Sequence, residues 1–211
     1  MKRILVINPN CNERVTAGLR ESVTVFADAA EIECRTLSDG PFGIESDDDI
    51  ARVEPLVVAS IEAAQDFDAY VIACYSDPGL AQCRVRFDRP IFGMQQSAVE
   101  RAVASGERFG VLALSDASIA RHLAYIEHLG CLDRLAGELP LDISVDAAAR
   151  DPATLSKVVG VGRRLIDELG ARVLILGCAG MAACREPAEH TLGVPVIEPA
   201  QAAVSLAIEA A

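Results

Sequence analysis

The chain has 211 residues, of which 31 are acidic and 19 are basic, so its formal net charge is −12. Hydrophobic residues make up 51% of the chain and charged residues 24%, a balance that is typical of a folded protein and excludes an intrinsically disordered one. Binding to nucleic acid or to an anionic membrane needs clustered Lys and Arg that contact phosphate groups. The excess of acidic residues therefore argues against either as a partner.

The chain begins with a run that predicts a buried parallel strand. Residues 4–7 are apolar and mostly β-branched, and the turn signal Asn8-Pro9-Asn10 follows them. This apolar run is too short for a secretory signal, and no run reaches the roughly 18 residues of a membrane helix, so we expect a cytoplasmic protein without a membrane partner. We predict strands at 2–7, 31–36, 69–74 and 90–92, and helices at 12–29, 50–64, 78–84 and 95–104.

The second half of the chain repeats this alternation. We predict strands at 109–114, 173–176 and 194–197, extended chain at 139–145, and helices at 117–129, 155–169, 181–190 and 201–211. Strands that alternate with helices along the whole chain predict an α/β fold with mostly parallel sheets.

The two halves are also similar in detail, which indicates an internal duplication. Asn8 ends the first strand of one half and precedes Cys74 by 66 positions, while Ser115 ends the first strand of the other half and precedes Cys178 by 63. Each half therefore ends a later strand at a cysteine. Two similar lobes that face each other would bring these four strand ends to one cleft, where open α/β sheets bind ligands.

Seven cysteines, an odd number without a Cys-x-x-Cys pair, predict neither a disulfide framework nor a structural zinc site. Most of them are expected to be small buried hydrophobes, but Cys74 and Cys178 each lie where a strand gives way to a turn and a helix. Backbone N–H groups at such a position lower the pKa of a thiol and can bind an anionic oxygen. Two matched thiols can work on one carbon, with one as thiolate removing a proton while the other delivers one.

Other motifs give little support for a cofactor or a metal. There is no Gly-x-Gly-x-x-Gly sequence and no Walker loop, and the acidic run at 47–49 is typical of a helix start. His122, His128 and His190 lie on predicted helices without a nameable partner, and we interpret them as surface or satisfied helical side chains. We therefore expect no cofactor and no metal.

The chain also resembles a known family. Asn8-Pro9-Asn10, Cys74 with the following Asp77-Pro78-Gly79-Leu80, and the segment at 177–181 together resemble the aspartate/glutamate racemase superfamily, and most of all its hydantoin and allantoin racemase branch. The segments at 40–45 and 193–198 are similar to that branch too. The chain departs from that branch at Cys11, where Thr or Ser is usual, and at Leu114-Ser115, where a Thr-Thr pair is usual. It also departs at residues 93–96, where that branch has a Gly-x-x-Glu-Ala type of sequence.

The resemblance implies two pseudo-symmetric flavodoxin-like lobes with the active site in the cleft between them. We place lobe one at residues 1–95 with 195–211, and lobe two at residues 96–194. The resemblance also implies proton transfer without a cofactor, with Cys74 and Cys178 as catalytic residues. The implied substrate-binding residues are Asn8, Tyr75, Ser76, Asp77, Ser115, Ala179 and Gly180.

The leading hypothesis is a racemase or epimerase that acts on a carbon next to a carbonyl, in a 5-substituted hydantoin, allantoin or a related cyclic amide, ureide or carboxylate. Relatives that isomerise maleate use two cysteines, so the residues do not separate that reaction from racemisation. An arylmalonate-decarboxylase-like enzyme needs one cysteine and is disfavoured. A ligand-binding module without chemistry is the third reading. The acidic surface and Ala-rich helices are compatible with a homo-oligomer.

Overall fold

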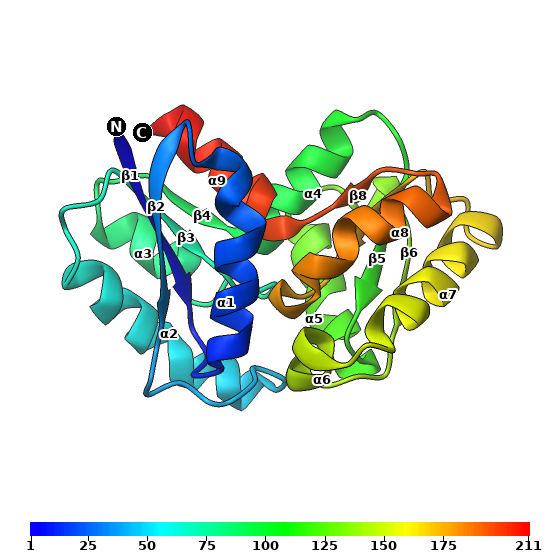
Figure 1. Ribbon diagram of the computed structural model, residues 1–211, viewed down its shortest axis with the longest axis horizontal. Helices are drawn as coiled ribbons and strands as arrows, with labels where there is room; N and C mark the ends of the chain where they lie inside the picture. The colour runs from blue at the N-terminus through cyan, green and yellow to red at the C-terminus, as the bar shows by residue number, and fades with distance from the viewer.

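Eight strands form two separate sheets of four, and every pairing within them is parallel. The computed structural model describes residues 1–211 (Figure 1). The strands are β1 (Lys2–Asn8), β2 (Ala30–Thr36), β3 (Ala69–Ile72), β4 (Ile91–Gly93), β5 (Phe109–Ala113), β6 (Leu135–Pro140), β7 (Val173–Leu176) and β8 (Val196–Ile197). The first sheet has the order β2-β1-β3-β4 and the second has β6-β5-β7-β8. The same order in both sheets confirms the predicted α/β fold with two similar lobes.

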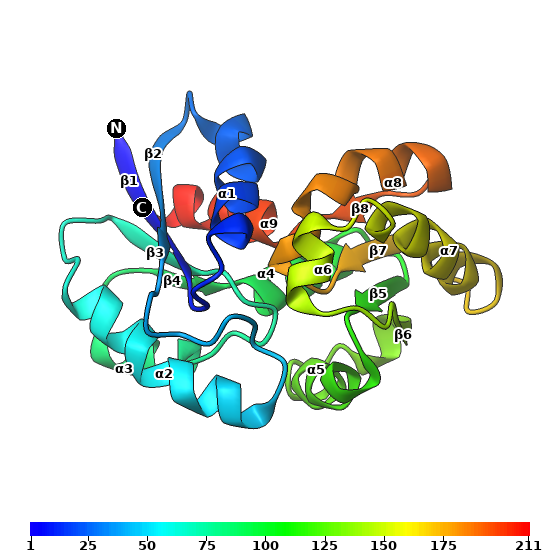
Figure 2. The ribbon, with the colours of Figure 1, turned by 60° about the horizontal axis from the view of Figure 1, so that its bottom comes forward.

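Helices cover both faces of each sheet, as the two views in Figures 1 and 2 show. The helices are α1 (Glu13–Ser22), α2 (Asp47–Glu62), α3 (Leu80–Arg86), α4 (Met94–Ala104), α5 (Asp116–His128), α6 (Val145–Arg150), α7 (Thr154–Asp167), α8 (Arg185–Leu192) and α9 (Pro199–Ala210). Short 3-10 helices lie at Val23–Phe26, Leu132–Arg134 and Ala179–Cys184. None of the helices combines the length and the apolar character that crossing a bilayer requires.

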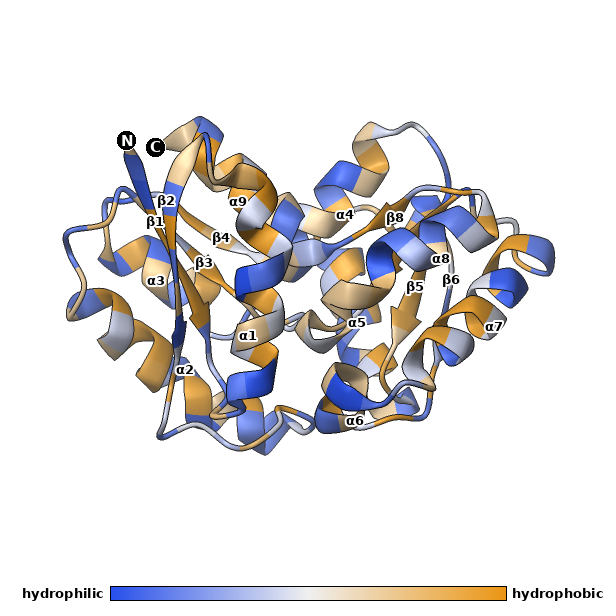
Figure 3. Ribbon diagram, viewed as in Figure 1, coloured by the Kyte–Doolittle hydropathy of each residue, from blue (hydrophilic) through white to orange (hydrophobic).

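The strands are apolar without interruption because both of their faces are buried. In β1, Ile4 and Val6 belong to the core shared with α1 and α9, whereas Leu5 and Ile7 belong to the core shared with α2 and α3. Successive side chains of a strand point to opposite faces, so a strand between two helix layers needs apolar residues at every position. Figure 3 shows the central strands in the hydrophobic colour between more polar helix surfaces.

Three predicted elements differ from the structure by more than a shift of their ends. The helix predicted at 12–29 ends at Ser22 and continues as a 3-10 turn, because the β-branched residues at 23–25 disfavour an α-helix. The extended segment predicted at 139–145 was placed too late, because β6 spans Leu135–Pro140. Helix α6 begins at Val145 after Ser144, whose hydroxyl accepts the N–H of Ala147. The helix predicted at 181–190 is a 3-10 turn followed by α8.

The C-terminal helix returns to the first sheet. Helix α9 packs against β1, β3 and β4, whereas β8, just before it, pairs with β7 of the second sheet. By these contacts β8 belongs to the second sheet and α9 to the first. The bounds of the two lobes, residues 1–95 with 195–211 and residues 96–194, stay a prediction. The strand ends of the two sheets position the site.

Candidate active site

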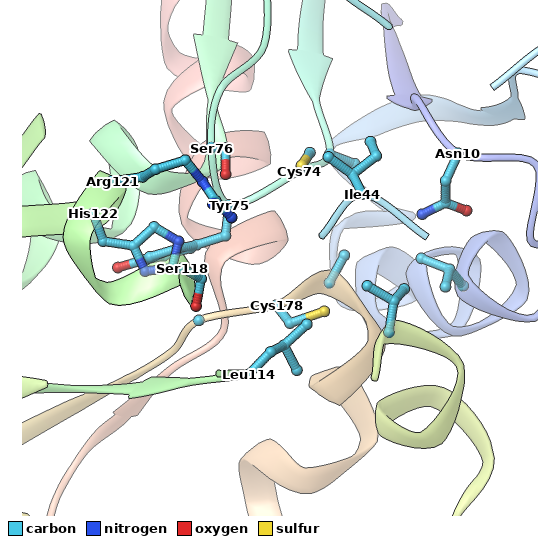
Figure 4. Close-up of a pocket in the computed structure, with 15 residues that line it drawn as sticks. Asn10, Ile44, Cys74, Tyr75, Ser76, Leu114, Ser118, Arg121, His122 and Cys178 are labelled. Atoms are coloured by element: carbon cyan, nitrogen blue, oxygen red, sulfur yellow. The ribbon is translucent and has the colours of Figure 1, made fainter. Parts of the chain in front are cut away.

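A pocket of about 460 Å³, including its open mouth, lies at the carboxyl ends of strands from both sheets (Figure 4). Its walls are Asn10, Val15, Ile44, Ala73, Cys74, Tyr75, Ser76, Leu114, Ser118, Arg121, His122, Val145, Gly177, Cys178 and Ala179. Loops and helix starts from both halves of the chain supply these residues, as the duplication predicts. No group of three His, Cys, Asp or Glu side chains in the structure is arranged to hold a metal ion.

Cys74 and Cys178 occupy matching places and line the same pocket. Cys74 lies two residues after the end of β3, and Cys178 lies two residues after the end of β7. Cys178 caps a 3-10 helix, and its sulfur accepts the N–H of Gly180 at 3.3 Å. The N–H of Ser76 stands in the same relation to Cys74, because its hydrogen bond lowers the pKa of that thiol. Each sulfur thus faces the N–H of the second residue after it.

Burial nevertheless dominates the ionisation of both thiols. The pKa of Cys74 is raised to about 12, mainly by loss of hydration and to a smaller extent by the nearby Cys178. Burial raises the pKa of Cys178 to about 11. The expectation of lowered thiol pKa values was therefore wrong, because the N–H donors of Ser76 and Gly180 offset only part of the desolvation.

Asn8 supports the pocket from beneath instead of lining it. Its side chain is completely buried, and its Nδ2 donates to Asn10 Oδ1 at 3.0 Å and to Thr16 Oγ1 at 2.9 Å. The side chain that reaches the pocket wall from this turn is that of Asn10.

Asp77 also lies behind the wall. Its carboxylate accepts the N–H groups of Gln95 and Gln96 at 2.9 Å each, at the start of α4. Burial raises the pKa of Asp77 to about 7. The carboxylate leaves no room beside it, since a Cβ on Gly93 would lie 2.2 Å from its Cγ. Asp77 therefore fixes the loop that carries Cys74 to the start of α4.

The remaining predicted residues divide between the wall and its surroundings. Tyr75, Ser76 and Ala179 line the pocket, whereas Gly180 reaches it only through the N–H that it donates to the sulfur. Ser115 directly precedes α5 and lines a second hollow that adjoins the first.

Helix α5 contributes three wall residues that sequence reasoning did not assign to the site. Ser118, Arg121 and His122 follow one another at spacings of three and one, so they share a face of the helix. Figure 4 draws them on the side of the pocket away from Asn10. This polar face is the only signal in the sequence, and it has the same appearance as an ordinary solvated face.

His122 has a partner after all. Its side chain is buried, and Nδ1 lies 2.5 Å from Oε1 of the buried Glu138 on β6. The ring of Tyr75 meets the imidazole edge-on, with 4.9 Å between the centroids. The interpretation as a satisfied helical histidine holds, but the ring also forms part of the pocket wall.

The loop between β2 and α2 closes the pocket over the second half of the chain. Ile44 reaches the pocket wall, and the carboxylate of Glu45 accepts the N–H of Val145 at 2.8 Å. Arg121 forms an ion pair with Asp47 at 3.3 Å. We call residues 37–47 the strap, because they connect the first sheet to α5 and α6.

Comparisons with known proteins agree with this architecture. The sequence model of the Asp/Glu/Hydantoin racemase family matches residues 4–207. The chain belongs to this family. It is thus an isomerase that acts on a small molecule, and the resemblance noted in the sequence is confirmed.

Individual relatives are similar over nearly the whole chain. A hydantoin racemase from Paenarthrobacter aurescens is 32% identical over 97% of this chain and 89% of its own length. A hydantoin racemase from Rhizobium meliloti is 33% identical over 97% and 86%. The structure of an allantoin racemase from Klebsiella pneumoniae has a TM-score of 0.95 and 27% identity, over 99% of this chain and 87% of that one. A structure of an arylmalonate decarboxylase mutant shares the fold, with a TM-score of 0.75 and 20% identity over 100% of this chain and 92% of that one.

Proposed function

We propose that this chain racemises a carbon next to a carbonyl, in a 5-substituted hydantoin or in allantoin, and that Cys74 and Cys178 transfer the protons. The observation that carries the proposal is that two cysteines end equivalent strands and line one pocket. Hydantoin and allantoin racemases among the relatives support the substrate class.

The reaction needs one thiolate and one thiol. The thiolate removes the hydrogen of C5 as a proton, and the electron pair left on C5 spreads into the neighbouring carbonyl to form an enolate. The opposite thiol then gives its proton to the other face of C5, so that configuration inverts and the two cysteines exchange protonation states. Polar groups of the wall, such as the hydroxyl of Ser76, can donate to the enolate oxygen. No cofactor is consumed in these steps.

The decisive measurement is optical rotation of an enantiopure panel. Allantoin and several 5-substituted hydantoins should lose rotation in the presence of the chain, and dialysis against a chelator should leave the rate unchanged. Stable rotation with every compound would contradict the proposal. Release of carbon dioxide from an arylmalonate, or isomerisation of maleate, would replace it with one of the other reactions of this fold.

We also propose that the chain works in the cytoplasm as a homo-oligomer. All seven cysteines are free thiols, which suits a reducing compartment. Large apolar side chains are exposed at Val25, Phe42 and Val85, and burying them between copies of the chain would remove apolar surface from water.

A further inference from the structure

Removal of a proton next to a carbonyl needs a hydrogen-bond donor in the pocket, because the negative charge of the enolate collects on its oxygen. The backbone N–H groups of Ser76 and Gly180 face the sulfurs of Cys74 and Cys178, so they are not free for that oxygen. Both terminal nitrogens of Arg121 are bound to its own helix and to the strap, and its Nε is wholly buried. The enolate oxygen therefore needs another donor in the wall.

His122 turns one ring nitrogen to a buried carboxylate and the other to the pocket. Its Nδ1 lies 2.5 Å from Oε1 of Glu138, and the two side chains are only 3% and 0% exposed. Its Nε2 has no hydrogen-bond partner within the chain. Four side-chain polar atoms are wholly buried without a partner, and Nε2 is not among them, so it keeps contact with the open space that His122 lines.

The protonation of the pair decides what Nε2 presents to the pocket. A buried net charge is costly, and no cation other than His122 pairs with Glu138. Burial also raises the pKa of Glu138. A pair without net charge is either an imidazolium beside a carboxylate or a neutral imidazole beside a carboxylic acid. In both forms one proton lies between Nδ1 and Oε1 and the other is on Nε2, so the pocket receives an N–H group.

The place of His122 suits the oxygen of an enolate. An enolate is planar, so the two sulfurs approach its carbon from the two faces and the oxygen lies in the plane between them. In Figure 4 the sulfurs of Cys74 and Cys178 lie one above the other, and the ring of His122 lies to the left of both. Tyr75, which directly follows Cys74, holds that ring in place with an edge-on contact of 4.9 Å between the centroids.

We infer that His122 is a further catalytic residue, whose Nε2–H donates a hydrogen bond to the enolate oxygen. The inference rests on the proposed racemase function. The bond between C5 and its hydrogen breaks as one sulfur takes the proton, and the electron pair forms the carbon–carbon double bond of the enolate. The opposite thiol then protonates C5 and the carbonyl re-forms. Nε2 keeps its proton throughout, and Glu138 is a positioning residue that holds Nδ1.

Two hydantoins with enolates of different stability test the inference. In enantiopure 5-phenylhydantoin the ring on C5 spreads the negative charge, whereas in 5-benzylhydantoin more of the charge stays on the oxygen. In His122→Leu, kcat for the benzyl compound should fall about 100- to 1000-fold with less than about a threefold change in KM, because the charge on the oxygen develops only in the transition state. The fall in kcat for the phenyl compound should be smaller by about threefold or more, after subtraction of its spontaneous racemisation.

Three further variants separate catalysis from loss of structure. His122→Gln keeps an N–H donor, so its kcat should stay about tenfold or more above that of His122→Leu. Because His122→Leu leaves Glu138 without a partner, the double variant with Glu138→Leu is measured beside it and should show the same fall. His128→Leu, at an exposed histidine on the same helix, is the matched control and should change neither kcat nor KM. Urea denaturation shows which variants are folded under the conditions of the assay.

The outcomes distinguish the inference from the function on which it rests. If the unaltered chain racemises neither hydantoin nor allantoin, the proposed function fails. If the chain racemises them but folded variants without His122 keep kcat within about threefold, or change KM alone, the inference is overturned while the racemase proposal stands. Equal losses in His122→Leu and His122→Gln would assign the effect to packing and would overturn it too.

Discussion

Burial raises the pKa of both pocket thiols, so Cys74 and Cys178 are weaker acids than an exposed cysteine. The pKa of Cys74 is about 12 and that of Cys178 about 11, whereas an exposed thiol ionises near about 8.5. Both thiols are therefore neutral at neutral pH. A bound substrate has to stabilise one thiolate, and the N–H groups of Ser76 and Gly180 already point at the sulfurs that need this help.

We predict that alkylation of both thiols by iodoacetamide accelerates steadily from about pH 7 to about pH 10. The thiolate is the nucleophile, and its fraction rises about tenfold for each pH unit below the pKa, so the raised pKa values move the plateau to alkaline pH. Peptide mapping by mass spectrometry follows each cysteine separately, with free cysteine as a parallel control that levels off above about pH 9. A plateau below pH 9 at Cys74 or Cys178 would contradict the effect of burial.

We predict that Cys74→Ser and Cys178→Ser each lower racemisation by about 100- to 10,000-fold, because a hydroxyl replaces one of the two groups that transfer protons. Each variant keeps one cysteine that can remove the hydrogen facing it. The variants should therefore exchange that hydrogen with D2O in opposite enantiomers, without inversion, as NMR can measure. Cys83→Ser, away from the pocket, is the matched control. If both variants exchanged the hydrogen of the same enantiomer, one cysteine would be the only base, and the two-thiol mechanism would be contradicted.

At the scale of elements, sequence periodicity predicted those parts of the site that lie at strand ends. Runs such as β3 and β7 are apolar on both faces and short, so their ends, and with them Cys74 and Cys178, could be placed. Helix α6 is only six residues long and has too few turns to show a period. Arg121 and His122 lie on a face of α5 whose partner comes from other elements, so no local pattern could assign them to a pocket.

Tight contact between the Cys74 loop and α4 leads to a stability prediction. In Gly93→Ala, the new Cβ would meet the Asp77 carboxylate at 2.2–2.5 Å, so the chain should lose about 1–3 kcal/mol of unfolding free energy. Gly160→Ala is the matched control, because nothing lies within 4 Å of its Cβ on α7, and it should gain about 0.5–1 kcal/mol. Urea denaturation measures both variants. Equal unfolding free energies of the two variants would show that the loop with Asp77 can move away from the new Cβ without destabilising the protein, which would contradict the prediction.

At the scale of the whole molecule, the internal duplication in the sequence was the main basis for predicting two similar lobes and one shared pocket. Two copies of one strand order put equivalent strand ends on opposite sides of a single pocket, so matched positions in the sequence indicated neighbours in space. The duplication failed where the halves differ. Asn8 is buried beneath the turn that follows β1, whereas Ser115 directly precedes α5 and lines the second hollow.

We predict that light scattering on the purified chain gives a mass that is a multiple of 22.3 kDa. The exposed side chain of Val85 is 92% accessible, and association of copies through such apolar positions would bury surface. Size-exclusion chromatography with light scattering over a range of protein concentrations makes the measurement. A constant mass of 22.3 kDa at all concentrations would contradict the homo-oligomer.

The return of α9 to the first sheet has a consequence for the order in which the chain matures. The second sheet is built from one continuous stretch, β5 to β8, so all of its strands have left the ribosome before α9 does. The first sheet emerges earlier, but on one of its faces only α1 is present to cover it until Ala203 and Val204 of α9 arrive to cover the rest. During synthesis, the half of the protein that is made first is therefore completed last, and a chain stopped before residue 199 would expose that apolar face to chaperones and proteases.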